Sequence, residues 1–174
     1  MNDPRSPSQT IGPFFGFALP WPAGAAPIAA GEIGAIQVHG RLFDGRGDPV
    51  SDGLIETWAP RGFARSATDR EGRYAVTTLK PAAIAADAGV VHAPHLLVSI
   101  FARGLLRRLV TRIYFPDEHA ANDRDPVLAN MGDAAARATL LAARDEGPDA
   151  DHPPGAYRFD IRLQGPGETV FFDV

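Results

Sequence analysis

The sequence contains no cysteine among its 174 residues, so disulfide bonds and thiolate metal sites are excluded. A chain without cysteine fits a reducing compartment, and we expect a cytoplasmic location. The first ten residues are polar and contain proline, so we expect no signal peptide. No apolar run approaches the length that spans a membrane. The formal net charge of −4 argues against nucleic acid as a partner.

The signatures of several enzyme classes are also missing. There is no G-x-S-x-G sequence for a nucleophilic serine, no phosphate-binding P-loop and no glycine pattern for a dinucleotide. Paired carboxylates occur only in segments that are expected to be turns. These absences argue against the hydrolases and nucleotide-binding enzymes that use such motifs.

The composition that is present favours a mainly β fold. Apolar residues make up 45% of the chain, enough for a packed core. The 18 glycines and 16 prolines, about a fifth of all residues, favour short strands joined by tight turns over a helix bundle. We expect a single domain over residues 1–174, with an irregular N-terminal arm at 1–32 and a β-sandwich core at 33–174.

Apolar and polar residues alternate with period two through much of the core, which predicts strands. The strand at 54–58 is expected to return beside the one at 36–43. The connections are too short for helical crossovers, so an antiparallel sandwich or barrel is expected. Asp125, followed by Pro126, and Asp133 are expected to cap short helices. The expected strands are 36–43, 54–58, 73–79, 95–102 (the most apolar, and therefore central), 108–115, 157–163 and 169–174.

The N-terminal arm combines helix-breaking residues with large rings. Its prolines and glycines keep it out of a central strand or a long helix. It also carries Phe14, Phe15, Phe17 and Trp21, which need an apolar surface to cover them. From the residues alone, that surface belongs either to the same domain or to a partner subunit.

The histidines are the candidate metal ligands. A metal site needs three or four converging ligands. His92 and His95 are three residues apart on an extended segment, which is expected to place them on opposite faces. Each histidine by itself is better explained as a surface group or a hydrogen-bonded structural group. A metal site made by His92, His95 and His119 remains an alternative. The five histidines are His39, His92, His95, His119 and His152.

One local group of arginines stands out, formed by Arg103, Arg107, Arg108 and Arg112. As a structural feature, it is a charged hairpin that keeps a strand edge soluble. As a functional feature, it recognises a carboxylate, since a planar guanidinium matches a planar anion. The pattern alone leaves both interpretations open.

Several segments resemble the intradiol ring-cleavage dioxygenases. The matching core segments are 40–50, 55–58, 68–74 and 93–98. Three further segments, 6–14, 99–104 and 157–173, resemble the non-catalytic alpha subunits of the two-chain members of that family. The resemblance therefore implies an intradiol-type β-sandwich and a hetero-oligomer with a beta subunit. It also implies that the N-terminal arm docks on that partner.

The resemblance extends to the metal site only in part. The family's catalytic chains hold Fe(III) with two tyrosines and two histidines. His95 matches the first histidine, but Leu97 stands at the second and Ile84 at one tyrosine. Segment 59–63 is too short to carry the other tyrosine. The resemblance thus implies that this chain binds no metal and that the beta subunit holds the iron.

The family pattern also implies which residues reach the substrate. Thr10, Gly12, Pro13 and Arg103 match positions that line the substrate pocket of the beta subunit. Glycine allows close backbone approach, proline makes a rigid wall, and threonine offers a hydroxyl. Arg103 can balance the charge of a substrate carboxylate or catecholate. No catalytic residue is expected in this chain.

The implied reaction is cleavage of protocatechuate with O2 to 3-carboxy-cis,cis-muconate, a step of aromatic catabolism in the β-ketoadipate pathway. We expect the isolated chain to be inactive. The chain is short after Trp21 and between Trp58 and Thr68, where other members carry longer segments. The alternative is a β-sandwich module with a binding or structural role and no enzymatic one.

Overall fold

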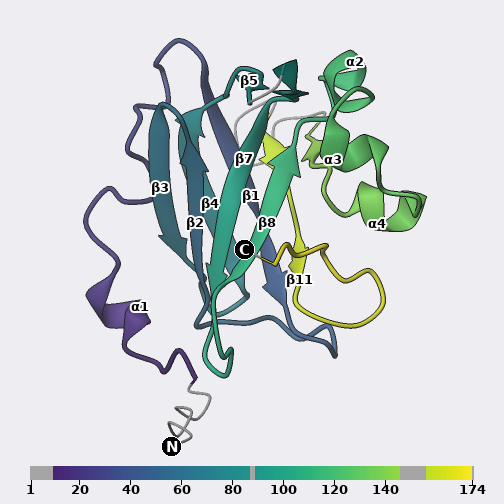
Figure 1. Ribbon diagram of the computed structural model, residues 1–174. Coiled ribbons are helices and arrows are strands. Elements are labelled where there is room, and N and C mark those ends of the chain that lie inside the picture. Colours follow the sequence, from purple (N-terminus) through teal and green to yellow (C-terminus); the bar gives the residue numbers. More distant parts are fainter. Residues whose placement is uncertain (1–9, 87–88, 146–155, 174) are drawn as a thin grey trace, which may run out of the picture.

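The computed structural model describes residues 10–86, 89–145 and 156–173 (Figure 1). The first sheet contains β1 (Ala35–Phe43), β4 (Arg73–Leu79), β9 (Ala143–Arg144), β10 (Tyr157–Arg158) and β11 (Ile161–Arg162). The second has the order β3 (Gly62–Ala67), β2 (Leu54–Ala59), β7 (His95–Phe101) and β8 (Leu109–Tyr114). A separate pair joins β5 (Ile84–Ala85) to β6 (Val91–His92). The helices are α1 (Phe15–Ala18), α2 (His119–Asn122), α3 (Pro126–Ala129) and α4 (Ala134–Ala138).

The mainly β architecture with short helices confirms the expected fold class. As predicted for the most apolar strand, β7 lies inside its sheet, between β2 and β8, and both pairings are antiparallel. The prediction that 54–58 returns beside 36–43 is wrong. Strand β1 instead pairs antiparallel with β4, and β2 belongs to the other sheet. Period-two alternation identifies a strand, but it does not select the strand's partner.

Three further features differ from the predictions. Strand β3 was not expected, yet it pairs along its full length with β2. The predicted strand at 157–163 is split into β10 and β11, and both run parallel to β1 rather than antiparallel. Residues 169–173 do not form a strand. They run beside β8 through single bonds, such as the one from the Phe172 amide to the Val110 carbonyl (2.8 Å).

The short helices begin where the aspartate caps predicted. The Asp125 carboxylate accepts hydrogen bonds from the backbone N–H groups of Val127 and Leu128 at the start of α3. Asp133 does the same at α4. Both aspartates satisfy amides that have no partner within the first helical turn. Among the residues described, no helix is long and apolar enough to cross a membrane.

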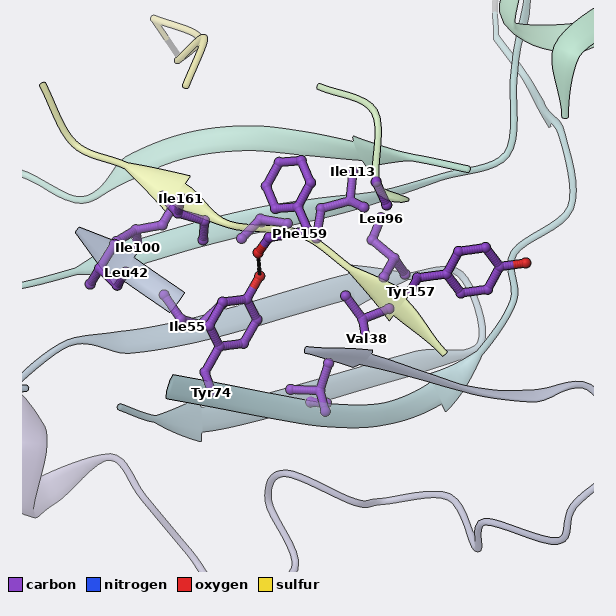
Figure 2. Close-up of a cluster of buried hydrophobic side chains, with 14 of the residues drawn as sticks. Val38, Leu42, Ile55, Tyr74, Leu96, Ile100, Ile113, Tyr157, Phe159 and Ile161 are labelled. Carbon is purple, nitrogen blue, oxygen red and sulfur yellow. Dashed lines mark hydrogen bonds between the residues drawn. The ribbon is translucent and has the colours of Figure 1, made fainter. Parts of the chain in front are cut away.

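The core lies between the two sheets (Figure 2). Along β4, Tyr74, Val76 and Thr78 point inward while the residues between them are less buried. The Tyr74 hydroxyl, inside the core, donates to the Phe159 carbonyl (2.6 Å), where β10 gives way to β11. This bond satisfies a buried polar group at the interruption of the strand. Other core residues are Val38, Leu42, Ile55, Ala64, Leu96, Val98, Ile100, Ile113, Phe115, Ala142, Tyr157 and Ile161.

The described part of the N-terminal arm packs against its own domain. Phe15 is buried against Phe101, with ring centroids 6.3 Å apart. Trp21 stacks on Phe63 at 5.6 Å, and the Arg65 guanidinium lies over both of these rings. Two backbone hydrogen bonds also hold the arm. The Arg65 amide of β3 donates to the Gly24 carbonyl, and the Thr77 amide of β4 donates to the Ala25 carbonyl.

Two aromatic rings of the arm remain uncovered. Phe14 is 78% exposed and Phe17 is 84% exposed, on either side of the buried Phe15. Docking on the same domain therefore buries Phe15 and covers Trp21 in part, at 42% exposure, but leaves these two rings in solvent. Large exposed apolar groups of this kind are typical of surfaces that contact another protein. The expected docking of the arm on a partner stays a prediction.

Gly40 is a point where only glycine fits. A Cβ atom on this residue of β1 would lie 2.0 Å from the Phe159 carbonyl oxygen, which is backbone and cannot rotate away. We predict that Gly40→Ala lowers the free energy of unfolding by about 2–4 kcal/mol, measured by urea denaturation of the whole chain. Gly132→Ala is the control, since a Cβ there meets nothing within 4 Å. Equal stability of the two variants would contradict this description of the parallel pairing.

Candidate functional site

The first described residues of the arm, around Ile11, lie beside the turn between β7 and β8. The Ile11 amide donates to the Leu105 carbonyl (2.8 Å), which joins the two segments. The Thr10 hydroxyl accepts from the Gly12 amide (3.2 Å), and Gly12 has a φ of 76°, a conformation that favours glycine. The family resemblance suggested four residues for substrate contact, and the structure places them in two adjacent segments. They are Thr10, Gly12, Pro13 and Arg103. We call them the arm–turn cluster.

Arg103 is the charged member of the arm–turn cluster. Its side chain is 70% exposed, and it forms an ion pair with Asp52, with 3.1 Å between Nε and the carboxylate. An exposed ion pair of this kind contributes little stability and exchanges easily. The guanidinium can therefore turn to another carboxylate that is presented from outside the chain.

A pocket of 270 Å³ lies at the opposite end of β7. It brings together three positions that were compared with iron ligands: Ile84, His95 and Leu97. The β2–β3 connection at its rim is a two-residue turn, because Ala59 pairs directly with Gly62. This turn leaves no room for a segment that could carry another ligand. We call this cavity the His95 pocket; it is lined by Trp58, Ala59, Pro60, Ile84, His95, Leu97 and Arg112.

His95 is held as a neutral structural group. It is 7% exposed, and its Nδ1 lies 2.8 Å from the Ala93 carbonyl, to which it donates. Burial lowers the pKa of His95, and the positive charge of Arg112 acts in the same direction. The prediction of a buried histidine satisfied by a backbone carbonyl is confirmed, but His95 is not a lone histidine, because His92 lies beside it. The Nε2 of His95 is then the hydrogen-bond acceptor of the ring.

The predicted separation of His92 from His95 is wrong. The two rings lie edge to face, with centroids 5.9 Å apart. The chain leaves β6 at His92 and enters β7, in a different sheet, at His95. The alternation of a single continuous strand therefore does not apply across this junction.

The buried Asp125 holds this junction together. Its carboxylate accepts from the Ala93 amide (2.9 Å) and the Tyr114 hydroxyl (3.1 Å), and His92 Nδ1 lies at 3.3 Å. Burial acts to raise the pKa of Asp125. The backbone N–H groups of Ala93, Leu128 and Val127 nevertheless hold the pKa below its usual value.

The residues of the His95 pocket do not fit Fe(III). His95 supplies one nitrogen, whereas Leu97 and Ile84 supply no donor atom. His92 Nδ1 lies against Asp125 and Arg112. Within the described ranges there is no group of three or more residues of the kinds that ligate metals, so the alternative site of His92, His95 and His119 is not formed. His39 lies elsewhere, 2.7 Å from Asp145, and His152 is outside the described residues.

Sequence reasoning did not identify Trp58, Arg112 or Asp125 as neighbours of His95. Trp58 and Arg112 are the cross-strand partners of Leu97 on β2 and β8. His95 and Leu97 are two residues apart on β7, which places them on one face of the strand. The neighbours on that face depend on strand register, which a single sequence does not reveal.

The comparisons with known proteins agree with the fold. The sequence profile of the dioxygenase family matches residues 60–165. The hydroxyquinol 1,2-dioxygenase of Pseudomonas putida DLL-E4 has a TM-score of 0.58 at 20% identity, covering 74% of this chain and 55% of that one. At this identity the structural match concerns the fold alone. The chain belongs to the family of intradiol ring-cleaving dioxygenases.

The relatives within that family are more specific. The protocatechuate 3,4-dioxygenase alpha chain of Burkholderia cepacia is 43% identical over 202 aligned positions, covering 98% of each chain. The alpha chain of Pseudomonas putida is 40% identical, covering 98% of this chain and 96% of its own length. The Burkholderia cepacia beta chain is 33% identical and covers 77% of this chain and 66% of its own length. An alignment of 202 positions exceeds the 174 residues of this chain, which therefore lacks segments that the relative has.

The Asp125 junction makes a pH-dependent prediction. Because the folded-state pKa of Asp125 lies below the unfolded value, about 3.9, its charge stabilises the fold above that pH. The contribution is lost as the pH falls through the folded-state pKa. Asp125→Asn should cost about 2 kcal/mol at pH 7, and the difference should shrink towards pH 3 in urea titrations.

Asp133→Asn is the matched control for Asp125. It also changes an N-cap aspartate, but Asp133 is exposed, and asparagine caps a helix as well as aspartate does. Its cost should be small at every pH. A pH-independent difference between Asp125→Asn and the unmodified chain would contradict the role assigned to the Asp125 charge.

Proposed function

We propose that this chain is the non-catalytic alpha subunit of a protocatechuate 3,4-dioxygenase. It assembles with a homologous beta subunit that holds Fe(III), and it completes the substrate pocket of that subunit. The observation that carries the proposal is the loss of ligands around His95 in a chain that keeps the arm–turn cluster. The identity to alpha chains over nearly the whole length supports it.

The geometry of β7 supports a pocket that is shared between chains. His95 begins this seven-residue strand, and Arg103 follows its end. At roughly 3.3 Å per residue, the two ends of the strand lie roughly 20 Å apart. The arm–turn cluster therefore cannot line the His95 pocket of its own chain. If it contacts a substrate near an iron ion, that ion is held by another chain.

The chemistry of the cluster suits the proposed substrate. Protocatechuate is a planar catechol with a carboxylate, and Arg103 offers a guanidinium whose present partner is an exposed aspartate. Gly12 and Pro13 provide backbone that can lie close to a flat ring. These groups position the substrate and balance its charge, and none of them takes part in bond making.

The same proposal covers the remaining organisation of the chain. It forms one domain over 1–174, and the arm at 1–32, with the exposed Phe14 and Phe17, docks on the beta subunit. The bound molecules at the shared pocket are protocatechuate and O2. We place the assembly in the cytoplasm, since a cysteine-free chain fits a reducing compartment.

The role of Arg103 is tested by substitution in the assembled enzyme. We predict that Arg103→Ala raises KM for protocatechuate about tenfold or more, because a hydrogen bond to a charged group is lost. Iron content should stay unchanged. Arg107→Ala is the matched control, since Arg107 is equally exposed and pairs with Asp173. Loss of iron, or disassembly, in Arg103→Ala alone would mean that the residue is structural.

The division of labour between the subunits is tested by reconstitution. Purified alone after expression in iron-rich medium, the chain should contain far less than one iron per molecule and should not cleave protocatechuate. Cleavage should appear on mixing with the beta subunit, followed by oxygen uptake. Stoichiometric iron in the lone chain, or cleavage without the partner, would refute the proposal.

A further inference from the structure

The His95 pocket is a cavity of 270 Å³ that combines apolar walls with two polar groups, although its residues do not fit a metal ion. Its walls are mostly apolar. Two of the lining side chains are large, apolar and exposed to solvent: Trp58 is 46% exposed and Leu97 is 40% exposed. Ile84 and Pro60 complete this apolar part. Exposed rings and aliphatic groups around a concavity are typical of small-molecule sites.

Arg112 gives the pocket a positive charge that lacks a direct counter-ion. Its Nη1 donates to the Tyr114 hydroxyl (3.1 Å), and its guanidinium lies over the Phe172 ring at 5.6 Å. Within the described residues it forms no ion pair with a carboxylate. The nearest negative charge in this network is Asp125, which accepts from the same Tyr114 hydroxyl. The Arg112 Nη1 also lies 3.3 Å from His92 Nδ1, which in turn lies 3.3 Å from Asp125. A partly buried guanidinium in such a setting favours an anion that can accept a forked pair of bonds.

His95 adds a second polar group of opposite character. Its Nδ1 donates to the Ala93 carbonyl, which leaves Nε2 as the acceptor of a ring that lines the cavity. The complementary group on a ligand is a hydroxyl that donates. An adjoining cavity of 440 Å³ shares Ala59, Pro60 and Ile84 with the pocket and leaves space for substituents.

We propose that the His95 pocket is a non-catalytic binding site for a small hydroxylated aromatic carboxylate. The ring lies among Trp58, Ile84 and Leu97, the carboxylate binds Arg112, and the hydroxyl donates to His95. The pocket lies wholly within this chain, so the inference does not rest on the proposed subunit role. No bond is made or broken there.

The test is a calorimetric titration of the full chain, without any partner, with 4-hydroxybenzoate. The proposal predicts saturable binding to one site. The uncharged 4-hydroxybenzamide should bind at least about tenfold more weakly, because it cannot pair with Arg112. No saturable binding of 4-hydroxybenzoate, or equal affinity for the amide, would overturn the proposal.

Two variants locate the site. Arg112→Leu should raise Kd at least about tenfold, whereas Arg108→Leu, an exposed arginine of the β7–β8 turn, should bind as the unmodified chain does. Should Arg112→Leu fail to fold by circular dichroism, Leu97→Phe tests the same site by filling it while every polar group of the Tyr114 network is kept. Its matched control is Leu106→Phe, since Leu106 is exposed on the turn. If both variants fold, unchanged affinity in Arg112→Leu and in Leu97→Phe would refute the assignment. If Arg112→Leu is unfolded, unchanged affinity in Leu97→Phe is enough to refute it.

Discussion

The rigid length of β7 is the constraint on which the two sites depend. Its backbone is bonded to β2 on one side and β8 on the other, so it can neither bend back nor slip. The strand therefore keeps the His95 pocket at one end and the β7–β8 turn, with Arg103, at the other. Figure 1 shows this turn at the lower end of β7. A single chain cannot use both ends on one small substrate. This separation is the physical reason for proposing that the arm–turn cluster serves a site on a second chain.

Contacts with β3, the edge strand of the same sheet, hold the arm in position. Arg65 on β3 forms an ion pair with the buried Glu56 on β2 and donates to the Leu19 carbonyl (2.6 Å). The buried Glu56 carboxylate needs a positively charged partner such as Arg65. Arg65 in turn holds the backbone of the arm at Leu19. Trp21 stacks on Phe63, and farther along the arm the bond from the Ile11 amide to the Leu105 carbonyl holds the chain at the β7–β8 turn. The fold thus presents the arm–turn cluster without help from a metal.

Local signals account for the parts of the fold that could be predicted. The alternation in β4, the apolar run of β7 and the caps at Asp125 and Asp133 are each contained in a few neighbouring residues. The parallel pairing of β1 with β10 and β11 joins residues more than a hundred positions apart, and no local pattern specifies it. The proximity of His92 and His95 depends on a change of sheet, which is also invisible to periodicity. The arm–turn residues were found through family resemblance, and the structure adds that their two segments are adjacent.

The most direct test of the account measures where the iron lies relative to the two ends of β7. The chain has no cysteine, so Leu106→Cys and Val91→Cys each provide a single labelling site, on the β7–β8 turn and near the His95 pocket respectively. A nitroxide is attached to each variant before assembly with the beta subunit, and its distance to the ferric ion is measured by electron paramagnetic resonance. The account predicts that the label at 106 lies closer to the iron than the label at 91. The reverse order would contradict the claim that this chain completes its partner's active site through the arm–turn cluster.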